Sequence, residues 1–196
     1  DRNVVEDLWA YCFEPKEHPF FRWYFTNMYE PENVLLGIQD DAVACLTHLN
    51  QYELNIRGIR FPVSYIVGLA THPAARRSGL GGKLLTASLK EMRRRGFYQQ
   101  YGYELYCHQW RETMPLDSLR LLTDRTVRFA FVDSADRWPY LDKVYRAYTS
   151  GLSGYAYRDE ASWRRHIEAQ LAEGNICVVF DGEDPVAYAF YQLGES

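Results

Sequence analysis

The sequence has 196 residues, of which 47% are hydrophobic and 24% charged, a composition typical of a globular protein with a sizeable core. Its net charge of −4 argues against a nucleic-acid partner and is compatible with a cationic one. No apolar run reaches transmembrane length, the four cysteines are scattered and the histidines lack metal-ligand spacing, so we predict a cytoplasmic protein with reduced thiols and no metal.

The first sixty residues predict two helices followed by a set of strands. Apolar residues recur at helical spacing over Val4–Phe13 and over Phe20–Tyr29. Alternating and β-branched residues then predict three strands, at residues 33–39, 42–50 and 52–59.

The stretch from Val63 to Gly96 is the most informative part of the chain. Val63–Thr71 is rich in apolar and β-branched residues and predicts a buried strand, which Pro73 ends because proline has no N–H to donate. Apolar residues at helical spacing predict a helix from about Leu80, with Gly96 as its C-terminal stop. The turn between strand and helix consists of Arg76, Arg77, Ser78, Gly79, Leu80, Gly81 and Gly82.

This turn has the composition of a pyrophosphate-binding site. Residues without bulky side chains let a ligand approach the backbone, and the first N–H groups of a helix have no partner within it. The turn fails the P-loop pattern because Arg77 stands where a glycine is needed and Leu84 where a hydroxyl is needed. Leu84 also breaks the dinucleotide-binding fingerprint. An ordinary glycine-rich turn without a ligand is the alternative.

The pattern R-x-x-G-x-G, formed by Arg76, Gly79 and Gly81, resembles the acetyl-CoA motif of the GNAT N-acetyltransferases. The resemblance implies an α/β fold, a mixed twisted sheet flanked by helices, with acetyl-CoA held at the end of the Val63–Thr71 strand. Residues 1–114 resemble more narrowly the N-terminal domain of the Eis-type (enhanced intracellular survival) acetyltransferases. The shared motifs are R-G-x-x-x-P-V-S-Y-I at 57–66, A-T-H-P-x-x-R-R-x-G at 70–79, M-R-R-R-G at 92–96 and Y-x-x-Y-G-Y at 98–103.

The resemblance implies chemical roles for the strand, the turn and a tyrosine. The strand backbone groups expected to pair with pantetheine and to donate toward the oxyanion are those of Leu69, Ala70 and Thr71. Residues 76–82 would wrap the pyrophosphate. Tyr98 matches the general acid of Eis-type enzymes, and a tyrosine stays protonated at neutral pH. The alternative for Tyr98 is a core aromatic, which is our interpretation of Tyr101 and Tyr103; we assign no general base.

The resemblance also places the acceptor pocket between the first two helices and the sheet. Our candidates there are Phe13, Glu14, Trp23 and Phe25, which supply aromatic walls and a carboxylate for a cation. Core packing is the alternative for each of them. The implied acceptor is a primary amine of a cationic small molecule, such as an aminoglycoside, or of a lysine, and the implied assembly is a homo-oligomer. The other hypothesis is a non-catalytic acetyl-CoA-binding scaffold with a lipid or protein partner.

One feature departs from the family pattern. In GNAT domains a further strand and a loop separate the cofactor helix from the F-Y-x-x-Y-G-Y segment, whereas here Phe97 follows Gly96 directly. Without that strand the sheet cannot open to hold the thioester. We therefore predict that a segment of the natural protein is missing from this sequence at or beside Gly96–Phe97.

The second half of the chain repeats the order of the first. Helical spacing predicts helices over Trp138–Tyr148 and Glu160–Glu173, and two apolar strands joined by an acidic turn follow. The earlier hairpin has the same acidic turn, at Asp40-Asp41. We interpret this as an internal repeat, as in the tandem GNAT domains of Eis-type proteins; coincidence is the alternative. The predicted organisation is an acetyltransferase domain at 1–114, a connector at 115–128 and a partial, truncated second GNAT-like domain at 129–196.

Overall fold

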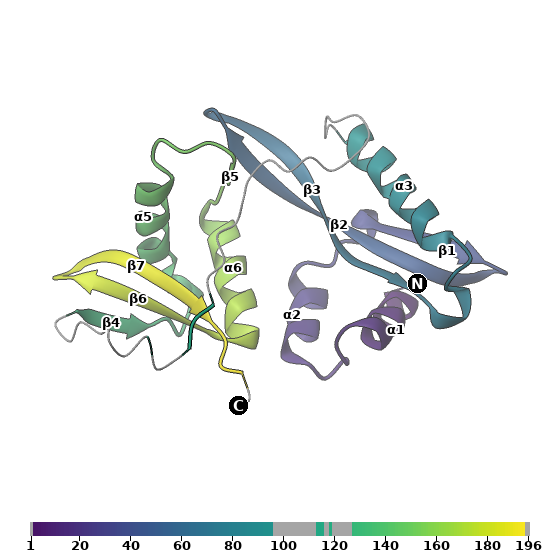
Figure 1. The fold of residues 1–196 in the computed structure, drawn as a ribbon, viewed down its shortest axis with the longest axis horizontal. Helices are drawn as coiled ribbons and strands as arrows, with labels where there is room; N and C mark the ends of the chain where they lie inside the picture. Colours follow the sequence, from purple (N-terminus) through teal and green to yellow (C-terminus); the bar gives the residue numbers. More distant parts are fainter. Residues whose placement is uncertain (1, 96–112, 116–117, 119–126, 195–196) are drawn as a thin grey trace. The chain divides into compact units, whose positions relative to one another are not determined.

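The computed structural model describes residues 2–95, 113–115, 118 and 127–194. They fall into two compact units, each with its own antiparallel sheet and its own helices (Figure 1). Unit 1 comprises Asp1–Tyr101 with Tyr155–Tyr157, and unit 2 comprises Gly102–Gly154 with Arg158–Ser196. Within these described stretches, no helix combines the length and the hydrophobicity needed to span a bilayer.

In unit 1, helices pack on both faces of a twisted antiparallel sheet (Figure 1). Strand β2 lies in the middle and pairs with β1, with β3 and, near its tip, with the short strand β5. The elements are α1 (Arg2–Cys12), α2 (Pro19–Asn27), η1 (Pro31–Asn33), β1 (Val34–Gln39), β2 (Ala42–Ile56), β3 (Ile59–Thr71), η2 (Pro73–Ala75), α3 (Leu80–Arg94) and β5 (Tyr155–Ala156). The predicted helices and the strands of the first hairpin are confirmed, with ends that differ by a few residues.

The separate third strand predicted at 52–59 is wrong. Strands β2 and β3 run through this region as one long hairpin, interrupted only by the two-residue turn at Arg57 and Gly58, both with positive φ. Pro62 does not break β3, because counting pairs from the turn places it opposite Glu53 at a position that exchanges no hydrogen bonds.

A buried polar network lies inside the core of unit 1. The hydroxyl of Tyr24 donates to Asn50 Oδ1 at 3.0 Å and lies 2.8 Å from His48 Nδ1. Since a phenol has one proton to give, Nδ1 of His48 must donate to Tyr24, which leaves Nε2 without a proton. This Nε2 atom is buried and has no hydrogen-bond partner among the described residues. Burial lowers the pKa of His48 to about 4.

Unit 1 is expected to lose stability in mild acid because of His48. Its pKa falls from an ordinary 6.5 to about 4 on folding, so the unfolded state binds more protons between these values. The stabilisation is fully present above pH 6.5 and is lost as the pH falls toward 4. Between about pH 7 and about pH 5 the opening free energy should drop by about 2 kcal/mol.

Hydrogen exchange of the β2 amides, corrected for intrinsic exchange rates, measures this drop for unit 1 alone. A local readout is needed because burial also lowers the pKa of His166 in unit 2 to about 4. The variant His48→Gln should lose most of the pH dependence of the β2 amides. An unchanged pH dependence in that variant would show that another group is responsible.

In unit 2, two helices cover one face of a second antiparallel sheet, whose strand order is β4-β6-β7 (Figure 1). Its elements are β4 (Arg128–Phe131), η4 (Ala135–Arg137), α5 (Trp138–Thr149), α6 (Glu160–Glu173), β6 (Asn175–Asp181) and β7 (Asp184–Tyr191). Trp163 is fully buried at the centre of the core, and its Nε1 donates to Asp142 Oδ1 at 2.9 Å. Helix α6 has the predicted limits, whereas β4 was not expected.

Candidate functional site

The candidate site lies where β3 ends and α3 begins. The backbone N–H of His72 donates to the carbonyl of Ala44 at 2.8 Å, which continues the β2–β3 ladder to its end. Because ladder bonds alternate along an antiparallel strand, the polar groups of the preceding residue, Thr71, point away from β2. The Nε of Arg76 donates to the Thr71 carbonyl at 3.2 Å and so fixes the turn against the strand end.

The turn between β3 and α3 leaves open space in front of the helix N-terminus. Gly79 precedes the helix with φ +79°, a conformation that favours glycine. A Cβ atom added at Gly79 or at Gly82 would meet no atom within 4 Å, so packing within the protein does not require glycine at either position. At Gly81 a Cβ would lie 3.2 Å from Thr71 Oγ1. Small residues facing open space at a helix N-terminus suit a bound pyrophosphate.

The positive charges of the turn are available to an anion. Arg76 and Arg77 are both exposed, and Lys83 follows in the first turn of α3. In the part of the chain that the structure describes, none of the ion pairs involves these three residues. Arg77 has φ +64°, which is uncommon for a residue with a side chain. The cluster therefore combines unpaired cations with free helix N–H groups, and it fits a pyrophosphate.

A β-bulge interrupts the β2–β3 ladder just before the site. Two residues of β3, Gly68 and Leu69, lie opposite the single β2 residue Thr47. Gly68 has φ +64°, and a Cβ at this position would lie 2.1 Å from the indole ring of Trp9. The bulge takes the backbone around Leu69 out of regular pairing. The bulge was not predicted from the sequence, although a lone glycine within a strand pattern is the usual signal.

Trp9 also connects the bulge to two of the predicted acceptor residues. Its ring lies 4.9 Å from that of Phe13, and its Nε1 donates to Glu14 Oε2 at 2.9 Å. Phe13 is 44% exposed, so its ring is accessible to a ligand. Trp23 instead stacks on a neighbouring phenylalanine of α2, and Phe25 is only 3% exposed within the core. The structure joins Phe13 and Glu14 through Trp9, whereas Trp23 is half-buried, with an Nε1 that lacks a hydrogen-bond partner among the described residues, and Phe25 lies in the core. All four stay predicted acceptor residues.

Some predicted features cannot be located. Tyr98, Tyr101 and Tyr103 lie outside the described residues, as does the Gly96–Phe97 junction where a missing segment was predicted. The general acid and the missing segment therefore stay predictions.

The variant Arg77→Gln is expected to raise the dissociation constant of acetyl-CoA about tenfold, because it removes one charge-assisted hydrogen bond to a phosphate. Isothermal titration calorimetry measures the change. Arg22→Gln is the matched control, since Arg22 is an exposed arginine of α2 in the same unit. An affinity that falls equally in both variants would reflect net charge alone and would contradict a contact at Arg77.

The chain is similar to a known protein family and to several solved structures. Residues 1–106 match the family model described as acetyltransferase (GNAT) domain. No curated protein sequence matches the chain. Solved structures with a similar fold include a GCN5-related N-acetyltransferase from Anabaena variabilis ATCC 29413, with a TM-score of 0.62 and 14% identity over 94% of this chain and 50% of that one.

Two further solved structures have a similar fold. A GCN5-related N-acetyltransferase from Kribbella flavida has a TM-score of 0.57 and 16% identity, over 94% of this chain and 54% of that chain. A conserved protein of unknown function from Enterococcus faecalis V583 has a TM-score of 0.59 and 13% identity, over 98% of this chain and 53% of that chain. At these identities the likeness concerns the fold alone, and it confirms the predicted fold class. The chain spans about half the length of each of these proteins.

Proposed function

The chain belongs to the GNAT acetyltransferase family, and from this premise we propose that unit 1 transfers an acetyl group from acetyl-CoA to a primary amine. The family implies an acyl-CoA cosubstrate. The observation that carries the proposal is the turn of residues 76–82, where unpaired guanidinium groups and glycines facing open space meet the N-terminus of α3. A turn that served only to connect strand and helix would need glycine at position 79, for its positive φ, but neither Gly82 nor the unpaired guanidinium groups.

Different residues of unit 1 have different roles in the acetyl transfer. Acetyl-CoA supplies an activated thioester. Arg77 and the first N–H groups of α3 hold the pyrophosphate. Of the three predicted residues, Thr71 and the bulged Leu69 hold the pantetheine arm through their backbone groups, while Ala70 is paired with Leu46 of β2. N–H groups that face away from β2 stabilise negative charge that develops on the carbonyl oxygen. Tyr98 holds the proton that the departing sulfur needs.

Glu14 and its aromatic neighbours favour a cationic acceptor. The carboxylate of Glu14 is half-buried and is oriented by Trp9, beside the exposed ring of Phe13. A carboxylate next to aromatic faces binds an ammonium group well. We therefore assign the acceptor to the primary amines of cationic small molecules, aminoglycosides among them, or of lysine side chains. The Eis-type assignment, a cytoplasmic location and a homo-oligomeric state belong to the same proposal.

The test is release of free thiol from acetyl-CoA by the full-length protein against polyamines, aminoglycosides and lysine peptides. Release with one acceptor class supports the transferase and identifies its substrate. Thiol release that needs no amine would indicate hydrolysis instead. Acetyl-CoA binding without turnover on any amine would overturn the proposal and favour a non-catalytic scaffold that binds a lipid or protein partner.

A further inference from the structure

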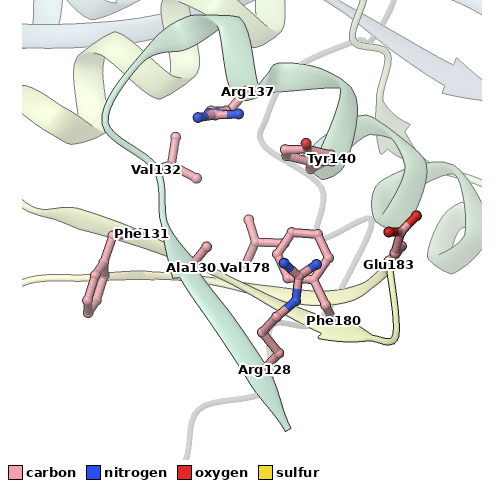
Figure 2. A pocket seen from close by; sticks show the side chains of 9 residues that line it. All are labelled: Arg128, Ala130, Phe131, Val132, Arg137, Tyr140, Val178, Phe180 and Glu183. Carbon is pink, nitrogen blue, oxygen red and sulfur yellow. The ribbon is translucent and has the colours of Figure 1, made fainter.

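Unit 2 contains a cavity of about 480 Å³ that the acetyl-transfer reaction does not use. It lies between the inner face of the sheet and the start of α5 (Figure 2). Its lining includes Arg128, Ala130, Arg137, Tyr140, Phe180 and Glu183. Its size is that of a pocket for a small organic ligand.

The cavity exists because a small residue occupies the inner face of β4. Arg128 lies opposite Phe180 in the ladder, and Ala130 lies opposite Val178, so all four share the face toward the helices. The methyl group of Ala130 leaves space between its larger neighbours. Phe131 also borders the cavity, although its ring alternates to the other face of β4 and is 64% exposed.

Two arginines give the cavity a positive charge. The guanidinium of Arg128 lies over the ring of Phe180 at 4.3 Å, as Figure 2 shows. A guanidinium stacked on a ring keeps its in-plane N–H groups free for an anion. Among the described residues, Arg128 forms no ion pair. Arg137 makes a long contact of 3.9 Å with the exposed carboxylate of Asp133 and also interacts with the exposed Asp136, which pairs with Arg164 at 2.6 Å. A ligand can displace such surface contacts at little cost.

The start of α5 also borders the cavity. Arg137 precedes the helix and Tyr140 lies in its first turn, and both line the cavity. Helix α5 continues directly from η4, whose N-cap Ser134 accepts a hydrogen bond from the Asp136 N–H and whose first turn carries the Asp136 carboxylate. The Trp138 N–H donates to the Ala135 carbonyl and Pro139 has no N–H, so the helix start offers few free donors and the two arginines supply the positive charge.

The ring of Tyr140 packs edge-on against Phe180 at 5.5 Å, so the cavity has an aromatic wall beside its cationic groups. Among the described residues of the lining, the one carboxylate is that of Glu183, on the turn between β6 and β7.

We propose that this cavity binds a small organic phosphate with a planar ring, of the size of a nucleoside monophosphate. The phosphate lies between Arg128 and Arg137, close to the N-terminus of α5. The planar ring packs against the exposed ring of Tyr140, because Arg128 already covers Phe180, which is only 5% exposed. Glu183 accepts a hydrogen bond from an amine or hydroxyl of the ligand. A carboxylate without a ring would use only the two arginines and would leave the aromatic wall uncovered.

Isothermal titration of the full chain with AMP, and separately with inorganic phosphate, tests the proposal. AMP should bind at least about tenfold more tightly than inorganic phosphate, because only AMP covers the aromatic wall. The double variant Arg128→Gln/Arg137→Gln should weaken AMP binding by at least about tenfold. Ala130→Leu, which fills the cavity without changing its charge, should do the same.

Two control variants show which of the two units binds AMP. Arg165→Gln removes an exposed arginine of α6 and should leave the AMP affinity unchanged. Arg77→Gln alters the turn of unit 1, so it separates the two phosphate sites. AMP affinity that is lost in Arg77→Gln but kept in the double variant would overturn the proposal, as would equal binding of AMP and inorganic phosphate. Circular dichroism of each variant shows that the fold is retained.

Discussion

Replacing Tyr98 by phenylalanine is expected to lower the turnover number for amine acetylation by at least about 100-fold, with the dissociation constant of acetyl-CoA unchanged. Phenylalanine keeps the aromatic ring and removes only the proton that the leaving thiolate would accept. The affinity should persist because pyrophosphate binding is assigned to residues 76–82. Thiol release at saturating acceptor gives the turnover number, and calorimetry gives the affinity.

The neighbouring tyrosines provide matched controls for Tyr98. Tyr101 and Tyr103 belong to the same Y-x-x-Y-G-Y motif, and we interpret both as core residues. Their phenylalanine variants should change turnover by less than about threefold, since a core tyrosine contributes mainly through its ring. If Tyr98→Phe keeps full turnover, or if all three variants lose the same fraction of it, Tyr98 is not the general acid.

Local patterns in the sequence were enough to predict the kinds of elements in unit 1 but not the length of its strands. The predicted break after Asn50 falls at the polar residue Gln51. In the structure Gln51 lies opposite Ser64, and its Nε2 donates to Ser64 Oγ at 2.8 Å. A polar pair across two strands therefore continues the ladder at a position where the sequence of one strand suggests an end.

The predicted parts of the site consist of residues that are close together in the sequence. The missed parts depend on contacts between residues that are far apart in the chain. The turn at 76–82 has its residues in one stretch, so its motif was visible in the sequence. The contact of Trp9 with Gly68 joins residues far apart in the chain, and nothing near either residue indicates it. Strand β5 was missed for the same reason, because its two residues pair with the distant tip of β2.

The largest loss of stability is expected from Gly68→Ala, with a decrease of about 3 kcal/mol in the opening free energy of unit 1. Two effects add at this position. Alanine at φ +64° carries a backbone cost of about 1 kcal/mol. The new methyl group would lie 2.1 Å from the ring of Trp9, which the core holds in place and whose Nε1 is bonded to Glu14. Hydrogen exchange of the β2 amides measures the decrease.

The variant Gly58→Ala separates the backbone cost of alanine at positive φ from the cost of the clash with Trp9. Gly58 also has positive φ, at +81°, but a Cβ there would meet no atom within 4 Å, so this variant should lose only the backbone term of about 1 kcal/mol. The difference between the two variants is then the cost of moving Trp9 away from the bulge. That movement would also disturb Glu14, so Gly68→Ala should raise the KM for the amine acceptor more than the dissociation constant of acetyl-CoA. Equal stability of the two variants would show that Trp9 does not pack against the bulge in solution, and the orientation of Glu14 would then need another cause.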